Sequence, residues 1–133
     1  MQGKRQFAIL TSAGLSLALG SLAAAHHGVS SYEMREVLEL EGVVVKWDWK
    51  SPHTWLTLEV TAGGEVQTWE IEGAPPQWMA AQGWSPASLT AGEAVTITFH
   101  PLKEQANGGI LMEVARADGE KLKVNRPARL GGP

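Results

Sequence analysis

The sequence predicts a mainly β protein: a small OB-like barrel of five to six strands, with one short helix between strands three and four. From residue 37 onward, apolar and polar residues alternate in short runs rich in β-branched residues, a pattern typical of strands. Turns that contain glycine or proline separate these runs. Closure into a barrel would remove exposed strand edges, whereas an open sandwich, which the same pattern permits, remains the alternative.

The first half of this pattern predicts three consecutive strands, at residues 37–49, 53–60 and 66–72. Gly42 interrupts the first run, and a glycine inside a strand often marks a bulge or a sharp bend. The segment 62–64 contains two glycines, which can adopt the positive φ angles of a hairpin turn. We therefore expect a long, curved first strand, followed by a β-hairpin.

The second half begins with a segment that does not alternate. Residues 76–82 fit one or two helical turns, because proline is tolerated at the start of a helix and Gly83 suits its end. Alternation then resumes, and we expect the remaining strands at residues 94–100, 110–117 and 121–124. A helix between the third and fourth strands is the arrangement of an OB fold.

The start of the chain has the features of a secretory signal peptide. Lys4 and Arg5 precede an uncharged apolar run at residues 7–22, and the small residues Ala23-Ala24-Ala25 follow it. The apolar run is short for a membrane span, which needs about 20 apolar residues. We expect cleavage of residues 1–25, a periplasmic location and no integral membrane span after cleavage.

Cleavage divides the chain and changes its charge. The remaining chain comprises an N-terminal arm (26–36), a β-barrel domain (37–125) and a disordered tail (126–133). The 11 basic residues fall to 9 against 14 acidic ones, so the formal net charge changes from −3 to −5. This balance argues against a nucleic-acid partner, because such binding depends on clustered Lys and Arg. The absence of cysteine excludes disulfides and thiolate metal ligands.

Two of the four histidines, His26 and His27, lie at the predicted cleavage site. If cleavage follows Ala25, the free amine and imidazole of His26 can chelate one metal ion, and a third nitrogen from another histidine completes a set suited to copper. If cleavage follows Ala24, the amine, two amide nitrogens and the imidazole of His27 form a square-planar set, which selects Cu(II) or Ni(II). The alternative is adventitious metal binding by an exported terminus.

The other two histidines, His53 and His100, each lie beside a proline where a loop meets a strand. In an OB-like barrel, the loops after strands one and four flank the binding face, so both are candidate metal ligands. The alternative for each is a structural histidine that forms hydrogen bonds within a turn. Sequence alone does not place the two within bonding distance of each other.

Six tryptophans are many for a chain of this length. Three of them cluster around the first predicted hairpin: Trp47, Trp49 and Trp55. They could form an exposed platform for a sugar, a peptide or a lipid headgroup, because exposed apolar patches usually mean contact. The alternative is packing, since tryptophan buries a large area. Of the others, we expect Trp69 and one of Trp78 and Trp84 in the core.

The residues give little support for catalysis. No two acidic residues have a spacing that forces their carboxylates together, and no serine lies in a nucleophile-elbow sequence. The chain also lacks a phosphate-binding glycine loop. We therefore expect a non-enzymatic protein, although a copper oxidase built on the terminal histidine stays open.

Several short motifs of this chain occur together in one family. They are Ala25-His26-His27, a strand at 43–49 that ends in tryptophan, Ser51-Pro52-His53-Thr54-Trp55, Gly83-Trp84 with Ser88-Leu89 and Gly92-Glu93, and Asp118-Gly119-Glu120-Lys121-Leu122. With these motifs the chain resembles a family of small exported bacterial proteins grouped as a domain of unknown function. Ser51 stands where that family usually has asparagine. The resemblance implies export and a small β domain, and it implies no particular activity.

Two functional hypotheses follow. The first is a periplasmic binding module for copper, which uses His26 and His27 together with His53 or His100. The second is an interaction module without metal, which holds a periplasmic partner on the surface of the three clustered tryptophans.

Overall fold

The computed structural model describes residues 28–104 and 106–126 of the chain. The predicted signal peptide, His26, His27 and residues 127–133 of the predicted tail lie outside this part.

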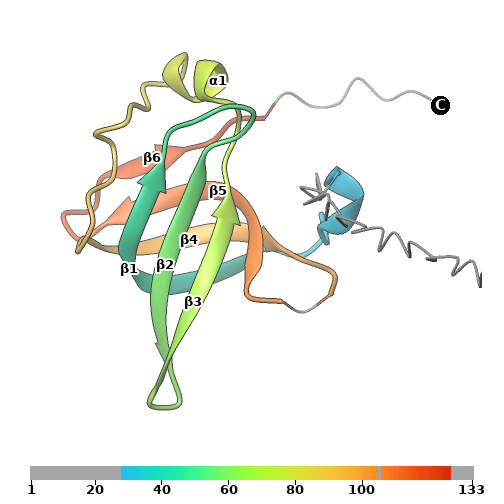
Figure 1. Ribbon diagram of the computed structural model, residues 1–133, viewed down its shortest axis with the longest axis vertical. Coiled ribbons are helices and arrows are strands. Elements are labelled where there is room, and N and C mark those ends of the chain that lie inside the picture. Colours follow the sequence, from blue (N-terminus) through green and yellow to red (C-terminus); the bar gives the residue numbers. More distant parts are fainter. Residues whose placement is uncertain (1–27, 105, 127–133) are drawn as a thin grey trace, which may run out of the picture.

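The described residues form six β-strands, one α-helix and one short 3₁₀ helix (Figure 1). In chain order these are η1 (Val29–Ser31), β1 (Leu38–Asp48), β2 (Trp55–Ala62), β3 (Glu65–Glu72), α1 (Pro76–Ala80), β4 (Ala94–Pro101), β5 (Gly108–Arg116) and β6 (Lys121–Lys123). The predicted mainly β fold, with one short helix between the third and fourth strands, is confirmed.

Five of the strands close into a ring. The antiparallel order is β3-β2-β1-β4-β5-β6, and a parallel pairing of β3 with β5 joins the two sides, so that β6 alone lies outside the ring. The parallel pairing is short, joining Glu70–Glu72 to Gly108–Ile110. This closure removes most exposed strand edges, as the OB-like prediction required.

The long strand β1 takes part in both sides of the ring. Its first half pairs with β4 and its second half with β2, and the change of partner falls at Val43. Gly42 lies one residue earlier, where a Cβ atom would come within 2.9 Å of the carbonyl oxygen of Glu59. A glycine at this position therefore allows the backbones of β1 and β2 to approach closely, in agreement with the predicted bend.

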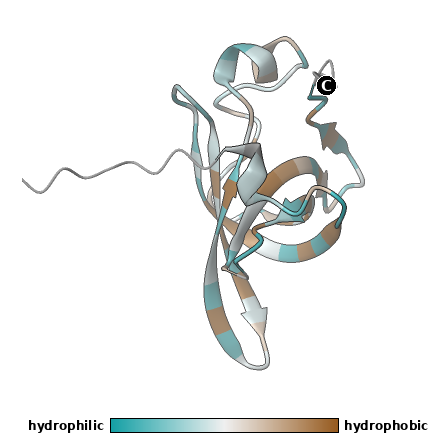
Figure 2. Cartoon of the chain, turned by 90° about the vertical axis from the view of Figure 1, so that its right-hand side faces the viewer, coloured by the Kyte–Doolittle hydropathy of each residue, from teal (hydrophilic) through white to brown (hydrophobic). Residues whose placement is uncertain are grey.

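The hydrophobic core fills the inside of the ring. Alternating residues of the strands point inward, and Figure 2 shows this alternation of hydropathy along the strands. The fully buried apolar side chains are Val44, Leu56, Leu58, Ile71, Met79, Ile97, Phe99, Leu111 and Val114. Helix α1 lies over one end of the ring, while the β2–β3 hairpin projects at the other (Figure 1). Each such side chain contributes about 1.5–3 kcal/mol of stability through its burial.

In the part of the chain that the structure describes, no helix has the length and apolar character needed to cross a membrane.

Candidate functional site

The site is built around Glu72, the last residue of β3. Its neighbour Ile71 points into the core, so alternation places the Glu72 side chain on the outside of the ring. Glu72 is nevertheless only 4 % exposed, which is rare for a carboxylate unless it is paired. Two side chains from distant parts of the sequence provide the pairing.

Each oxygen of the Glu72 carboxylate has its own partner. The ring nitrogen Nδ1 of His53 lies 2.5 Å from Oε1, and the hydroxyl of Tyr32 donates a hydrogen bond to Oε2. A carboxylate only accepts hydrogen bonds, so Nδ1 of His53 carries the proton in this contact. In the neutral imidazole the other nitrogen, Nε2, then has a free lone pair. The His53 side chain is 35 % exposed, so the ring is in contact with solvent.

Tyr32, the only tyrosine of the sequence, is 3 % exposed. Its burial, and then its hydrogen bond to Glu72 and the charge of that residue, raise the pKa of the phenol far above its usual value of 10. The hydroxyl therefore stays protonated and acts as the donor to Glu72 over the whole physiological range of pH.

This pKa shift predicts a loss of stability at high pH. The pKa is higher in the folded state than in the unfolded state, so the stabilisation is complete below about pH 10 and is lost as the pH rises through the folded-state pKa. Above about pH 10, the free energy of unfolding should fall by up to about 1.4 kcal/mol per pH unit more in the wild type than in Tyr32→Phe. Urea unfolding of both proteins across this range measures the difference, and parallel curves would contradict it.

The arm (here residues 28–36) is held along the end of β4 and the loop that follows. The amide of Lys103 donates to the carbonyl of Ser31 at 3.0 Å, and the amide of Glu33 donates to the carbonyl of Pro101 at 2.8 Å. His100 Nδ1 lies 2.7 Å from the carbonyl oxygen of Glu36. These contacts place the arm across the outside of the ring, where η1 lies beside the loop between β4 and β5 (Figure 1).

The loop that carries His53 is fixed against the end of β3. Thr54 is fully buried, and its hydroxyl donates to the carbonyl of Ala74 at 2.9 Å. The amide of Gly73 donates to the carbonyl of Thr54 at 2.8 Å, which extends the pairing of β2 with β3 beyond Trp55. The contacts of Thr54 with Gly73 and Ala74 therefore hold the neighbouring residue His53 next to Glu72.

Replacement of Gly73 should disturb this loop. A Cβ atom at residue 73 would overlap with the hydroxyl of the buried Thr54. We expect Gly73→Ala to lower the free energy of unfolding by about 1–3 kcal/mol, the usual effect of overpacking. Gly64→Ala is the opposite case, because a Cβ there meets no atom within 4 Å and only its φ of 84° is unfavourable. Chemical denaturation compares the two, and a larger loss for Gly64→Ala would contradict this account.

Arg126, the first residue of the predicted tail, also lies near the site. Burial lowers the pKa of its guanidinium, while the charges of Glu72 and Tyr32 oppose that shift. Two of its nitrogens, Nε and Nη2, are buried without a hydrogen-bond partner among the described residues. Arg126 is therefore close enough to Glu72 for the two charges to interact.

The two histidines of the domain that were predicted as metal ligands, His53 and His100, each make a polar contact through Nδ1. His53 lies in the loop after β1, as expected, and donates from Nδ1 to Glu72. His100 lies inside β4, one residue before its end, and its Nδ1 contacts a backbone carbonyl. Among residues 28–104 and 106–126, no three His, Cys, Asp or Glu side chains are grouped to hold a metal ion.

Sequence reasoning did not single out Tyr32 or Glu72. One signal was present for each: Tyr32 is an isolated aromatic residue in a polar arm, and Glu72 follows a buried Ile71 where the strand ends at Gly73. Neither signal points to the other residue, because the two are 40 positions apart in the sequence.

Two of the three tryptophans predicted to form a platform take part in packing. Trp47 and Trp49 are half-buried against the core, and their ring centroids are 5.9 Å apart. The indole N–H of Trp47 donates to the carbonyl of Ser85 at 3.0 Å. Trp55 is half-buried on β2, directly opposite Glu72. For Trp47 and Trp49, this arrangement agrees with the packing alternative.

Of the remaining tryptophans, only Trp84 is buried in the core. Trp84 is 3 % exposed, packs 5.6 Å from Trp47 and donates its indole N–H to the carbonyl of Lys123. Trp69 was also expected in the core, but it is only half-buried and packs against the outer part of the core beside Phe99. Trp78 is 47 % exposed, so Trp84 is the core member of the pair that the sequence left open.

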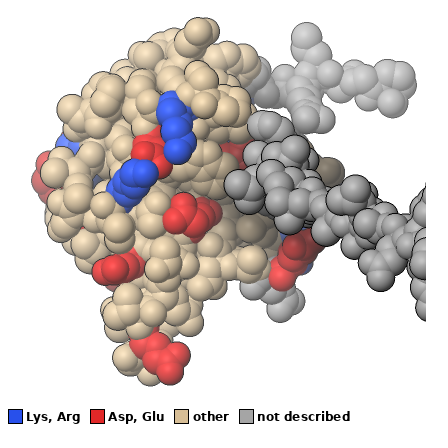
Figure 3. Space-filling view, viewed as in Figure 1, with Lys and Arg blue, Asp and Glu red and all other residues tan. Residues whose placement is uncertain are grey.

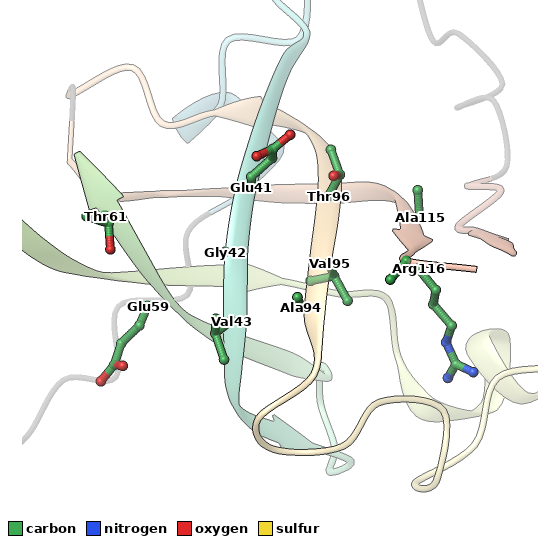
Figure 4. Close-up of a pocket in the computed structure, with 11 residues that line it drawn as sticks. Glu41, Gly42, Val43, Glu59, Thr61, Ala94, Val95, Thr96, Ala115 and Arg116 are labelled. Carbon is green, nitrogen blue, oxygen red and sulfur yellow. The ribbon is translucent and has the colours of Figure 1, made fainter. Parts of the chain in front are cut away.

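A shallow groove of about 420 Å³ lies elsewhere on the ring, over β1, β2, β4 and β5 (Figure 4). Arg116 borders it, but its guanidinium is already paired with Glu93 and Glu120, each at 3.1 Å. Neither Glu72 nor a histidine lines this groove. It therefore offers no chemistry comparable to that around Glu72.

The surface charges of the described residues include close pairs of opposite sign. On the face shown in Figure 3, the few basic side chains lie beside acidic ones and form no continuous basic patch. Asp48, for example, pairs with Lys46 at 2.8 Å and with Lys50 at 3.5 Å.

The fold and the site define a small, mainly β, OB-like protein in which one buried carboxylate joins an N-terminal tyrosine to a loop histidine. A family model described as "Family of unknown function (DUF6152)" matches residues 15–112. The protein belongs to this family, which agrees with the resemblance seen in the sequence. No curated protein matches the chain.

Proposed function

We propose that this protein is exported to the periplasm and binds copper there without being an enzyme. His53 would supply one ligand, and the histidines at the start of the mature chain, His26 and His27, would supply others. The observation that carries this proposal is the contact of 2.5 Å between Nδ1 of His53 and the buried carboxylate of Glu72.

This contact has the form that metal-binding histidines usually show. A ligating histidine almost always donates its second ring nitrogen to a carboxylate or a backbone carbonyl, which fixes the tautomer and makes the ligating nitrogen more basic. His53 donates to a carboxylate, and His100 has the backbone version of the same contact. In both rings, Nε2 would be the nitrogen available to a metal.

The anchoring of the arm supports the participation of the N-terminal histidines. Tyr32 binds the same carboxylate as His53. It follows His27 by only five residues, three of which form the 3₁₀ helix η1. This short separation along the sequence links the N-terminal histidines to the part of the arm that is anchored at Glu72. Copper is the favoured metal, because a set of amine and imidazole nitrogens without thiolates suits Cu(II).

The alternative tryptophan platform has less support, since Trp47 and Trp49 pack against the core.

The proposal is tested on protein exported from the full-length precursor. Its intact mass identifies the first residue, and a Cu(II) titration followed by electron paramagnetic resonance counts and types the sites. We expect one tight, nitrogen-rich site, weakened at least tenfold in His27→Ala and in His53→Ala, as loss of a ligand requires. His100→Ala decides whether the second ring of the domain takes part. Weak binding that none of these changes alters would refute the proposal.

A further inference from the structure

We infer that metal binding at His53 and docking of the arm are one coupled equilibrium, with Glu72 as the acceptor that both share. This inference rests on the proposed function and adds its regulation: the metal would fasten the arm to the ring, and a docked arm would strengthen the metal site.

The first argument is that each oxygen of the Glu72 carboxylate already accepts a hydrogen bond. Oε1 accepts from His53 and Oε2 accepts from Tyr32, and the residue is 4 % exposed. If the arm left the ring, Oε2 would lose its donor in a buried position. A buried acceptor without a donor is unfavourable, more so when it is charged. The carboxylate would then rotate or admit water, and the orientation of His53 would be less restricted.

The second argument is that a metal ion bound to His53 would in turn favour docking of the arm. A cation on Nε2 withdraws electron density from the imidazole, so the N–H group at Nδ1 becomes a stronger donor to Glu72. This stabilises the carboxylate in the position from which it also accepts the hydrogen bond of Tyr32. Tyr32 then docks onto an acceptor that is already oriented, so less conformational freedom is lost when the arm binds. Any effect of docking on metal affinity must equal the effect of metal on docking, because the coupling is reciprocal.

The chain contains reporters of docking that do not touch Glu72. The amides of Glu33 and Lys103 donate across the contact between the arm and the ring, to Pro101 and Ser31 respectively. Their hydrogen exchange measures how often the arm leaves the ring. The chain also offers a matched control, because Glu70 lies two residues before Glu72 on β3 but is exposed and bonded to Thr57 at 3.1 Å.

The experiment is hydrogen exchange of the exported protein, with and without Cu(II) at a concentration that saturates each variant. We expect Cu(II) to slow exchange at the amides of Glu33 and Lys103 at least threefold in the wild type and in Glu70→Gln. In Glu72→Gln, this slowing should be absent. Copper that binds through His53 without changing these rates in the wild type would overturn the inference and leave the proposed function intact. Copper binding that is indifferent to His53→Ala would refute the proposed function itself.

A second variant decides the question if Glu72→Gln does not fold. Tyr32→Phe keeps the aromatic ring but removes the hydroxyl, which is not expected to touch the metal. We expect its metal-free protein to exchange the two reporter amides faster, and its Cu(II) affinity to fall about 3- to 10-fold, as expected for loss of one hydrogen bond. An unchanged affinity, with faster exchange, would show that docking and metal binding are independent.

Discussion

Glu72→Gln should lower the affinity for Cu(II) by about 10- to 100-fold, the usual effect of removing the carboxylate behind a ligating histidine. A carboxylate accepts hydrogen bonds at both oxygens, whereas a glutamine amide has one accepting oxygen and one donating nitrogen. The amide that replaces the carboxylate could not accept from both Tyr32 and His53. If its nitrogen faced His53, the ring would have to accept at Nδ1 and carry its proton on Nε2, which blocks the nitrogen proposed to bind the metal.

Competition with a chelator of known affinity measures this loss, and ¹⁵N magnetic resonance of the metal-free protein reports the tautomer of His53. Glu70→Gln, the same substitution at an exposed residue of the same strand, should change the affinity by less than about twofold, because surface substitutions usually have small effects. Equal affinities for the wild type and Glu72→Gln, with both proteins folded, would show that Glu72 does not support a metal ligand.

Trp84→Ala should lower the free energy of unfolding by about 3–5 kcal/mol, the range for removal of a large buried aromatic side chain. The Trp84 ring is 3 % exposed and packs against Trp47 of β1. Its N–H donates to the carbonyl of Lys123 on β6 at 2.9 Å, so one side chain ties the segment after α1 to two strands. Its loss would leave a cavity and one carbonyl without its donor.

Two variants separate these contributions in urea or heat denaturation. Trp84→Phe keeps an aromatic ring but removes the N–H, and we expect it to cost less than Trp84→Ala. Trp78→Ala makes the same substitution six residues earlier, where the side chain is 47 % exposed, and should cost less than about 1 kcal/mol. A loss from Trp78→Ala that equals the loss from Trp84→Ala would contradict the assignment of Trp84 to the core.

The predicted and observed elements agree where local chemistry decides the structure. The alternation within residues 94–100 places Val95, Ile97 and Phe99 on one face, and all three lie in the core. The glycines at 63 and 64 have positive φ angles, as the expected hairpin turn requires. Such features depend on neighbouring residues and backbone sterics alone, and for that reason a single sequence is sufficient to predict them.

The site could be predicted only in part, for a reason that is also physical. His53 was identified because a proline and a strand flank it in the sequence. Its two companions carry no comparable local signal. Glu72 has the same residue type as several exposed acids, and Tyr32 lies in an unpatterned arm. Their importance comes from burial and from hydrogen bonds between residues that are far apart in the chain.

By itself, the sequence determined the fold class, the succession of strands along the chain and the place of the helix between the third and fourth strands. These features follow from the alternation of apolar and polar residues and from the turn residues. Only the tertiary structure decided which tryptophan is buried and which acid is paired. The closing contact between β3 and β5 brings the end of β3 under the arm, and the loop after β1 meets it there. A buried carboxylate needs hydrogen-bond donors, and in this fold they come from residues that are distant in the sequence. No local sequence pattern specifies which residues these are.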